Sequence, residues 1–285
     1  MDKFCDLHAH SIFSDGTWMP EEIVEEAERL GLSAVALCDH NSIEGLPRFM
    51  AAARGKSVRA VPGIEFSTEY QGLELHILGL MVEPEHYDRI RAFLREYLRR
   101  KAESGRELVD ALCRGGYVLD YDKIAASTPN GNVNRAHIAA ELTRLQMVGS
   151  VKEAFATLLD PKVGYYKPIK KPDALETVAF IRELSAVPVL AHAFRSMQEP
   201  QLLAFLEEAV PCGLGAMETL YSTYDEETTR LSEEIADRFG LIHSGGTDFH
   251  GDKKPDIHLG TGRGGLAVPY DYLLRLDADR QEHIQ

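Results

Sequence analysis

The sequence has few cysteines and none of the spacings that use them in groups. Its four cysteines are far apart and include no C-x-x-C pair: Cys5, Cys38, Cys113 and Cys212. This distribution argues against a disulfide framework and against a thiolate zinc cage, since both need several cysteines close together. Most of the four lie in apolar segments, so we expect buried, reduced thiols.

Long apolar runs and an excess of positive charge are also missing. No unbroken apolar segment reaches the length of a membrane span, and the chain starts with Asp2 and Lys3 rather than with the apolar core of a signal peptide. We therefore expect a cytoplasmic protein. The formal net charge of −14 argues against binding of long duplex nucleic acid by phosphate neutralisation. The sequence also has no repeat of solenoid period.

What the chain does contain is an alternation of strand-like and helix-like segments. Its 285 residues are 44% hydrophobic and 27% charged, which is typical of a globular protein that buries a large core. Apolar or alternating runs predict strands at 3–7, 33–38, 58–64, 73–82, 187–191, 215–220 and 241–245. Amphipathic patterns predict helices at 20–30, 44–53, 173–184, 201–209 and 225–239. This order is typical of a (β/α) barrel.

From about Pro84 the pattern changes to helices alone. The sequence predicts a long charged helix over 87–112 and shorter helices over 134–145 and 151–159. The arginines of the long helix could form a nucleic-acid patch, but alternating charges on a helix are usually a solvated face, which we favour. We divide the chain into a discontinuous barrel, 1–84 and 166–285, and a helical insertion, 85–165, that caps the active site.

Ionisable side chains gather at or near the ends of the predicted strands. His8 and His10 follow the first strand one residue apart, so their imidazoles can point toward one position. Asp248 and His250 repeat this spacing after the last strand. Because the carboxyl ends of parallel barrel strands share one face, residues distant in sequence meet there. We predict a metal centre with nine ligands: His8, His10, Asp15, His40, Glu65, His76, His192, Asp248 and His250.

Six imidazoles and three carboxylates are too many for one ion and suit two or three. Nitrogen and oxygen ligands without thiolate favour Zn, Mn or Fe over Ca or Mg. His76 lies in an apolar run, where a histidine is more often a core residue, but its nearness to Glu65 favours a ligand role. Asp39 is interpreted as a side chain that orients a ligand histidine.

The motifs around these residues resemble those of the PHP (polymerase and histidinol phosphatase) family of metal-dependent phosphoesterases. Within it, the chain is most similar to stand-alone members that hydrolyse nucleotide or oligonucleotide phosphates. The matching segments, within residues 1–82 and 165–262, are DLHAHSIFSDG, LCDHNSIEG, PGIEFS, ELHILGL, LAHAF and GGTDFHG. The resemblance implies a distorted (β/α)7 TIM-like barrel with a helical insertion.

The resemblance also implies how the ligands are shared between ions. His8, His10, Glu65 and Asp248 would hold the first ion, with Glu65 bridging to a second held by His76 and His192. Asp15, His40 and His250 would hold a third. The residues implied in catalysis are His8, His10, Asp15, Glu65, Asp248 and His250. Ala193 stands where relatives have proline, a departure that concerns only the local turn.

Basic residues of the insertion and of the barrel are candidates to bind a substrate phosphate. The segment from Asn134 to Ile138 resembles the family's Arg-Pro-His-Ile motif, with Ala136 in place of proline. Arginine matches phosphate oxygens with two hydrogen bonds, and lysine acts as a point charge. The candidates, for each of which an ordinary surface charge is the alternative, are Arg135, His137, Lys167, Lys170 and Arg195.

The predicted reaction is hydrolysis of phosphate esters of nucleotides or short oligonucleotides by a metal-activated hydroxide. One alternative is a phosphatase for a small metabolite such as histidinol phosphate. Another is a non-catalytic or polymerase-associated module that keeps its metals for structure. The complete ligand set and the lack of a polymerase domain in this chain argue against that module.

Overall fold

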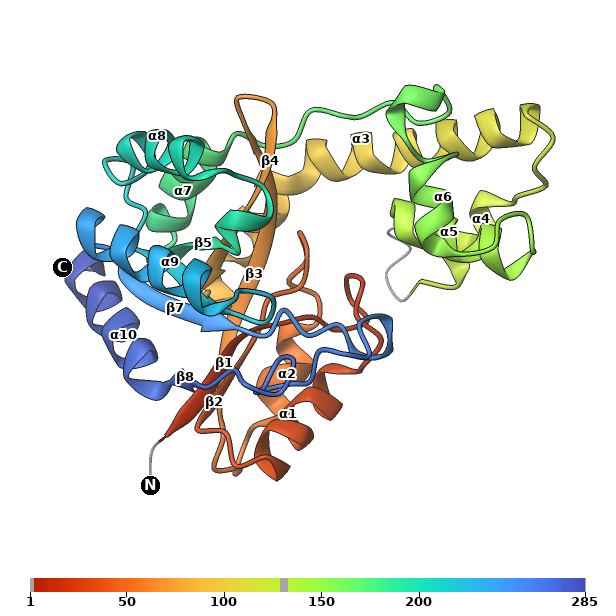
Figure 1. Ribbon diagram of the computed structural model, residues 1–285. Helices are drawn as coiled ribbons and strands as arrows, with labels where there is room; N and C mark the ends of the chain where they lie inside the picture. The colour runs from red at the N-terminus through yellow and green to blue at the C-terminus, as the bar shows by residue number, and fades with distance from the viewer. Residues whose placement is uncertain (1–2, 129–132, 285) are drawn as a thin grey trace. The chain divides into compact units, whose positions relative to one another are not determined.

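The computed structural model describes residues 3–128 and 133–284, and the chain divides into two compact units (Figure 1). One unit comprises Met1–Arg89 and Pro172–Gln285, and the other comprises Ile90–Lys171. These limits lie a few residues from the predicted boundaries of the barrel and the helical insertion. No helix in the described parts of the chain is long and apolar enough to cross a membrane.

The first unit is built on one eight-stranded sheet. Its strands are β1 Phe4–Ala9, β2 Ala34–Leu37, β3 Arg59–Tyr70, β4 Leu73–Leu80, β5 Val187–Ala191, β6 Ala216–Tyr221, β7 Ile242–Gly246 and β8 Val268–Pro269. They neighbour one another in the order β7-β6-β5-β4-β3-β2-β1-β8. The amide of Asp248 donates to the carbonyl of His8 at 2.8 Å, and the amide of His10 donates to the carbonyl of Phe249 at 2.9 Å. These bonds join the segment that follows β7 to β1 and so close the sheet, and the predicted distorted barrel is confirmed.

One strand breaks the parallel pattern. β4 runs antiparallel to both β3 and β5, whereas the other pairings among β1 to β7 are parallel. β3 and β4 are joined by the two residues Gln71 and Gly72, whose φ angles are 49° and 81°. Such a tight turn makes a hairpin, because a parallel connection needs a crossover of a dozen or more residues. The expectation of an all-parallel barrel is therefore wrong at β4.

Six helices pack on the outside of this sheet (Figure 1). They are α1 Pro20–Arg29, α2 Leu46–Ala52, α7 Ala174–Glu183, α8 Glu199–Ala209, α9 Glu226–Phe239 and α10 Tyr270–Ile284. α1 forms as its pattern predicts, with Pro20 in the first turn and Ile23, Val24 and Ala27 buried. No pattern in the sequence predicted α10.

The strands bury a continuous apolar core to which Cys5 and Cys38 belong, so these two thiols are buried as predicted. Cys113 is exposed and Cys212 is only partly buried. The prediction is wrong for Cys113 because this residue lies on the solvent side of its helix, next to the buried Leu112.

The second unit is helical and has a core of its own. Its helices are α3 Tyr87–Arg114, which begins in the first unit, α4 Tyr121–Ala126, α5 Arg135–Arg144 and α6 Val151–Ala156. Leu108, Leu112, Ile138 and Leu142 are among the side chains of its buried cluster. Charges along α3 pair with one another, as Arg99 does with Glu96 at 2.7 Å. This pairing agrees with the predicted solvated face.

Candidate metal centre

All nine predicted ligands lie in the first unit and meet in one region, and the sheet explains how. His8 and Glu65 belong to β1 and β3, while His192 follows β5 directly and Asp248 lies two residues after β7. His76 lies in the first half of β4, where it pairs in register with Ser67 and Ala191. The antiparallel direction of β4 thus brings the start of this strand to the edge where its neighbours deliver their polar residues.

Glu65 is the centre of the arrangement and is fully buried. Three imidazole nitrogens surround its Oε2: Nε2 of His8 at 3.3 Å, Nε2 of His10 at 3.2 Å and Nδ1 of His40 at 3.0 Å. Two more lie beside Oε1, namely Nδ1 of His76 at 2.8 Å and Nε2 of His192 at 3.0 Å. The carboxylate therefore connects two groups of imidazoles.

A further group of ligands lies at the partly exposed side of the site. Oδ1 of Asp15 is 3.2 Å from Nε2 of His250 and 3.9 Å from Nε2 of His40. Oδ1 of Asp248 is 3.2 Å from Nε2 of His10 and 3.3 Å from Nδ1 of His250. Three overlapping sets have ligand atoms within 4.8 Å of one another: His10, Asp15, His40 and His250; His8, His10 and Glu65; and His40, Glu65 and His76.

Several buried polar atoms of this cluster lack a hydrogen-bond partner, as expected of residues that bind metal ions. Within the described residues, Oε2 of Glu65, Nδ1 of His40 and Nδ1 of His76 are buried without any hydrogen-bond partner. A buried polar atom left unpaired costs free energy, and such groups are normally paired or coordinated. Clustered nitrogen and oxygen donors that lack hydrogen-bond partners are what divalent cations require.

The close contacts inside the site shift the pKa values of its ionisable side chains. Burial raises the pKa of Glu65, but the charges of His40, His76 and His8 outweigh burial and hold the pKa well below its usual range. Burial by itself would lower the pKa of His10, but its close contacts with Asp248 and Glu65 prevail and raise that pKa to about 9. The carboxylates are thus held in the charged form that binds metal.

Two ligands have unusual backbone conformations. His192 has φ 31° and Asp248 has φ 54°, both in the left-handed region that non-glycine residues rarely adopt. Each residue lies within two residues of the end of a strand. Such strain is concentrated at functional sites, where the surrounding structure holds it in place.

Glu218 in β6 was not among the predicted site residues, yet it contacts two of the candidate ligands. Its Oε1 lies 2.8 Å from Nδ1 of His8, and its Oε2 accepts a hydrogen bond from the amide of His192 at 2.7 Å. A carboxylate that accepts from Nδ1–H leaves Nε2 of His8 free to bind a metal. The available signal was a glutamate within the apolar run AMETLY, where an unpaired charge would be costly.

Asp39, interpreted from the sequence as a side chain that orients a ligand histidine, contacts the loop that follows His10. Its carboxylate accepts hydrogen bonds from the amide of Ser11 at 2.8 Å, from the hydroxyl of Ser11 at 2.6 Å and from the hydroxyl of Ser14 at 2.6 Å. Ser14 in turn lies 3.5 Å from Nδ1 of His10. Asp39 therefore fixes the loop after His10 and reaches that imidazole only through Ser14.

The five phosphate-binding candidates are divided between the two units. Arg195 belongs to the metal centre, where its Nη1 lies 3.3 Å from Oδ2 of Asp248. In the helical unit, the guanidinium of Arg135 lies 4.4 Å from the ring centroid of Tyr166, and Lys170 is exposed. Nδ1 of His137 accepts a hydrogen bond from the amide of Asn134 at 3.2 Å, which is a helix-capping contact.

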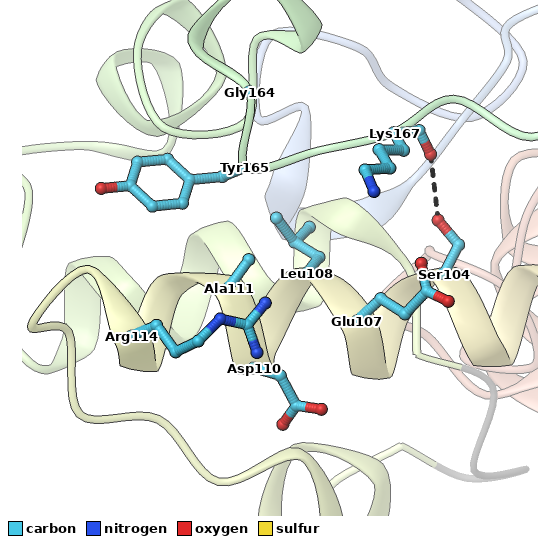
Figure 2. Close-up of a pocket in the computed structure, with 9 residues that line it drawn as sticks. All are labelled: Ser104, Glu107, Leu108, Asp110, Ala111, Arg114, Gly164, Tyr165 and Lys167. Atoms are coloured by element: carbon cyan, nitrogen blue, oxygen red, sulfur yellow. Dashed lines mark hydrogen bonds between the residues drawn. The ribbon is translucent and has the colours of Figure 1, made fainter.

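Lys167, the fifth candidate, lines a cavity of about 320 Å³ inside the helical unit (Figure 2). Its carbonyl accepts a hydrogen bond from the hydroxyl of Ser104 at 3.2 Å. The cavity lies along α3, where Glu107 and Arg114 line it together with Tyr165. Both signs of charge line this cavity, so it lacks the excess of positive charge expected of a phosphate site.

The fold and the site together define a class of protein: an α/β barrel with a buried cluster of histidines and carboxylates suited to several divalent cations. The model of the PHP domain family matches residues 6–170, which is more than half of the chain. The chain therefore belongs to the PHP domain family, as the motifs predicted.

Similar proteins agree with this assignment. The chain is 28% identical over 251 residues to a 5'-3' exoribonuclease of Haemophilus influenzae, covering 88% of this chain and 91% of that protein. It is 28% identical over 261 residues to a phosphoribosyl 1,2-cyclic phosphate 1,2-diphosphodiesterase of Eggerthella lenta, covering 90% and 97%. The crystal structure of a putative metal-dependent phosphoesterase of Bifidobacterium adolescentis superimposes with a TM-score of 0.85 at 26% identity, covering 97% and 96%.

Proposed function

We propose that this protein is a metal-dependent phosphoesterase that hydrolyses phosphate esters of nucleotides or short oligoribonucleotides. The observation that carries the proposal is the buried ligand cluster around Glu65, with three polar atoms that find no hydrogen-bond partner in the described residues. The Haemophilus influenzae relative, a 5'-3' exoribonuclease, supports the substrate class.

Two or three divalent ions, drawn from Mn, Zn and Fe, are the proposed cofactors. We assign the first ion to His8, His10, Glu65 and Asp248, the second to Glu65, His76 and His192, and the third to Asp15, His40 and His250. The contacts of Glu65 with five imidazoles support its bridging role. When bound, such ions lower the pKa of water and neutralise charge on phosphoryl oxygens.

The chain's own residues prepare the site for this chemistry. Glu218 fixes His8 in the tautomer whose Nε2 faces the cluster. Asp15 is partly exposed, so it lies where water and substrate enter. Arg195 is half exposed beside Asp248, and we assign it to a substrate phosphate.

The helical unit has a net positive charge, whereas the rest of the chain is acidic. Residues 90–171 contain 15 basic and 9 acidic residues, whereas the rest of the chain contains 16 basic and 36 acidic ones. A positive unit in an acidic protein suits a short polyanion better than a long duplex. We propose that Arg135, Lys167 and Lys170 contact the substrate and that the helical unit caps the active site. His137 is left out, because its Nδ1 already accepts the capping hydrogen bond of its own helix.

A small phosphorylated metabolite is the second candidate substrate. It is favoured by the similarity to the Eggerthella lenta enzyme, which acts on a phosphoribosyl cyclic phosphate. Both substrate classes place a phosphate ester at the same ligand cluster, so only turnover distinguishes them.

The test is to strip the protein of metal, add Mn²⁺, Zn²⁺ or Fe²⁺, and measure hydrolysis of nucleotides, bisphosphates, cyclic phosphates and short RNAs. Replacing Glu65→Gln removes the bridging charge and should reduce kcat at least about 1000-fold, as loss of a central electrostatic group does. Glu69→Gln, on the same strand, is the matched control and should keep the activity. Equal activity of both variants, or no hydrolysis by the wild type with any metal, would refute the proposed function.

A further inference from the structure

The cavity of about 320 Å³ in the helical unit contains none of the nine candidate metal ligands (Figure 2). Ligand pockets in proteins span roughly 300 to 1,000 Å³, so the cavity is large enough for a small molecule. One of its walls is formed by α3, and the other is formed by the segment 164–167. The residues that line it are Ser104, Glu107, Leu108, Asp110, Ala111, Arg114, Gly164, Tyr165 and Lys167.

The segment 164–167 is held against α3 at two points, and the cavity lies between them. At one point the hydroxyl of Ser104 donates to the carbonyl of Lys167 at 3.2 Å. At the other, the ring of Tyr165 lies on the backbone of Gly115, where an added Cβ would be 2.5 Å from the hydroxyl oxygen of Tyr165. The cavity is therefore a preformed space along about ten residues of α3, or about 15 Å at 1.5 Å per residue.

Charged side chains of both signs line this cavity: Glu107, Asp110, Arg114 and Lys167. Within the described residues, none of these four charges forms an ion pair, either with another of the four or with any other side chain. A purely anionic ligand would be repelled by the two carboxylates, and a purely cationic ligand by the two cations. A ligand with one charge of each sign can pair with both kinds of residue.

The spacing of these charges sets the length of such a ligand. Glu107 and Arg114 are seven residues apart on α3, which separates their Cα atoms by about 10 Å. Figure 2 shows the carboxylate of Glu107 beside Ser104 and the guanidinium of Arg114 beside Ala111, so both side chains lean toward the start of the helix. The separation of the two charges is therefore close to that of the Cα atoms. Three peptide residues in an extended conformation also span about 10 Å.

We propose that this cavity binds a short peptide of about three residues by its two charged ends. The terminal ammonium pairs with Glu107, and the terminal carboxylate pairs with Arg114, whose planar guanidinium can donate two parallel hydrogen bonds to it. Leu108 and Ala111 lie between these two residues and form an apolar floor that suits aliphatic side chains. Lys167 is a proposed substrate contact, so the ends of the peptide are assigned to Glu107 and Arg114 alone. This site has no part in the proposed hydrolysis.

NMR-monitored titration of the full-length protein with the tripeptide Leu-Ala-Leu tests the site. The peptide with free ends should bind one equivalent with a Kd below about 1 mM. N-acetylation and C-amidation each remove one terminal charge. Each should weaken binding about tenfold or more, since a hydrogen bond between charged groups is lost. No binding of the free tripeptide, or equal binding of the three forms, would overturn the proposal.

Two variants link each end of the peptide to one residue. Arg114→Met should weaken binding of the free tripeptide about tenfold and leave binding of its C-amide unchanged, because the amide has no carboxylate to lose. Glu107→Gln should likewise weaken the free tripeptide and spare the N-acetylated form. Both residues are exposed, so both variants should fold. Arg95→Met, an exposed position of α3 outside the cavity, is the matched control.

The pattern of losses decides the outcome. If Arg114→Met weakened the free and the amidated peptide equally, the carboxylate would not be bound by Arg114 and the proposal would be wrong. Chelation of metal should leave the Kd unchanged, since among the described residues the sets able to hold an ion all lie in the barrel unit. A Kd that rises on chelation would place the peptide at the metal centre instead of in the helical unit.

Discussion

At the scale of single residues, the site depends on how closely strand β7 approaches strand β1. The two strands meet where the amide of Asp248 donates to the carbonyl of His8. Gly246 lies at this contact, and a Cβ built on it would be 2.4 Å from Cβ of His8 and 2.6 Å from its amide nitrogen. Both distances are far below van der Waals contact, so only glycine fits without moving the ligand strand.

We therefore predict that Gly246→Ala destabilises the protein by about 1 to 3 kcal/mol, the usual cost of overpacking a core, and weakens metal binding. The displaced backbone carries His8 away from Glu65. Urea denaturation and metal titration of the variant measure the two effects. Gly265→Ala is the control, because a Cβ there meets nothing within 4 Å. If Gly246→Ala kept the stability and metal affinity of the wild type, the prediction would be wrong, because β1 could then move without disturbing the site.

The nine candidate ligands could be selected from the sequence because most of them stand where an apolar run ends. His8, His40, His192 and Asp248 interrupt or follow hydrophobic segments that cannot bury a charge without a partner. Glu218, and Lys254 beside Asp248, were not predictable in the same way. Glu218 lies within a strand, and Lys254 lies in a loop whose path to Asp248 is fixed only by the folded chain.

At the scale of elements, α10 is a helix whose local sequence does not indicate its contacts with the rest of the barrel unit. The second half of this helix, from about Asp277, is rich in polar residues and shows no clear apolar stripe. Leu273 and Leu276 are fully buried in the core of the barrel. Asp277 pairs with Arg59 at 2.5 Å, and Asp279 pairs with Arg182. The polar residues of α10 thus have partners that are distant in sequence.

Two leucines of this helix provide a matched comparison. Leu276→Ala should lower the free energy of unfolding by about 2 to 5 kcal/mol, because it removes a buried side chain and leaves a cavity. Leu274→Ala should change it by less than about 1 kcal/mol, since Leu274 is 49% exposed. Chemical denaturation of both variants gives the values. Equal losses would mean that α10 is held by its ion pairs rather than by its apolar face.

Seven strands of the barrel were predictable in their order along the chain, whereas the two-residue strand β8 was not predicted. Each of the first seven strands forms where its apolar run indicated, but the direction of β4 was not indicated by its composition. The signal was the connection Gln71–Gly72, which is too short for a crossover helix. Loop length therefore sets strand direction here, and with it the position of His76.

At the scale of the whole molecule, the metal centre and the second hydrophobic core belong to different units. All nine candidate ligands lie in the barrel unit, and the helical unit has its own buried cluster around Leu112 and Ile138. Among the described residues, the sets able to hold an ion all lie in the barrel unit. A ligand stabilises the structure that binds it, by about 2.7 kcal/mol at a hundred times its Kd.

Removing the metal should therefore loosen one unit and spare the other. We predict that chelation accelerates amide hydrogen exchange in β1, β3 and β4. Without the cations that they share, Glu65 and its imidazoles either repel one another or stay buried without a partner. Exchange in α5 should remain unchanged, because its packing involves no ligand. Mass spectrometry of the full chain with and without chelator measures both regions at once. In Glu65→Gln, added metal should restore little of the protection. Equal acceleration in α5 and in the barrel strands would contradict the separation, because the metal cluster would then support the whole fold rather than the unit that holds it.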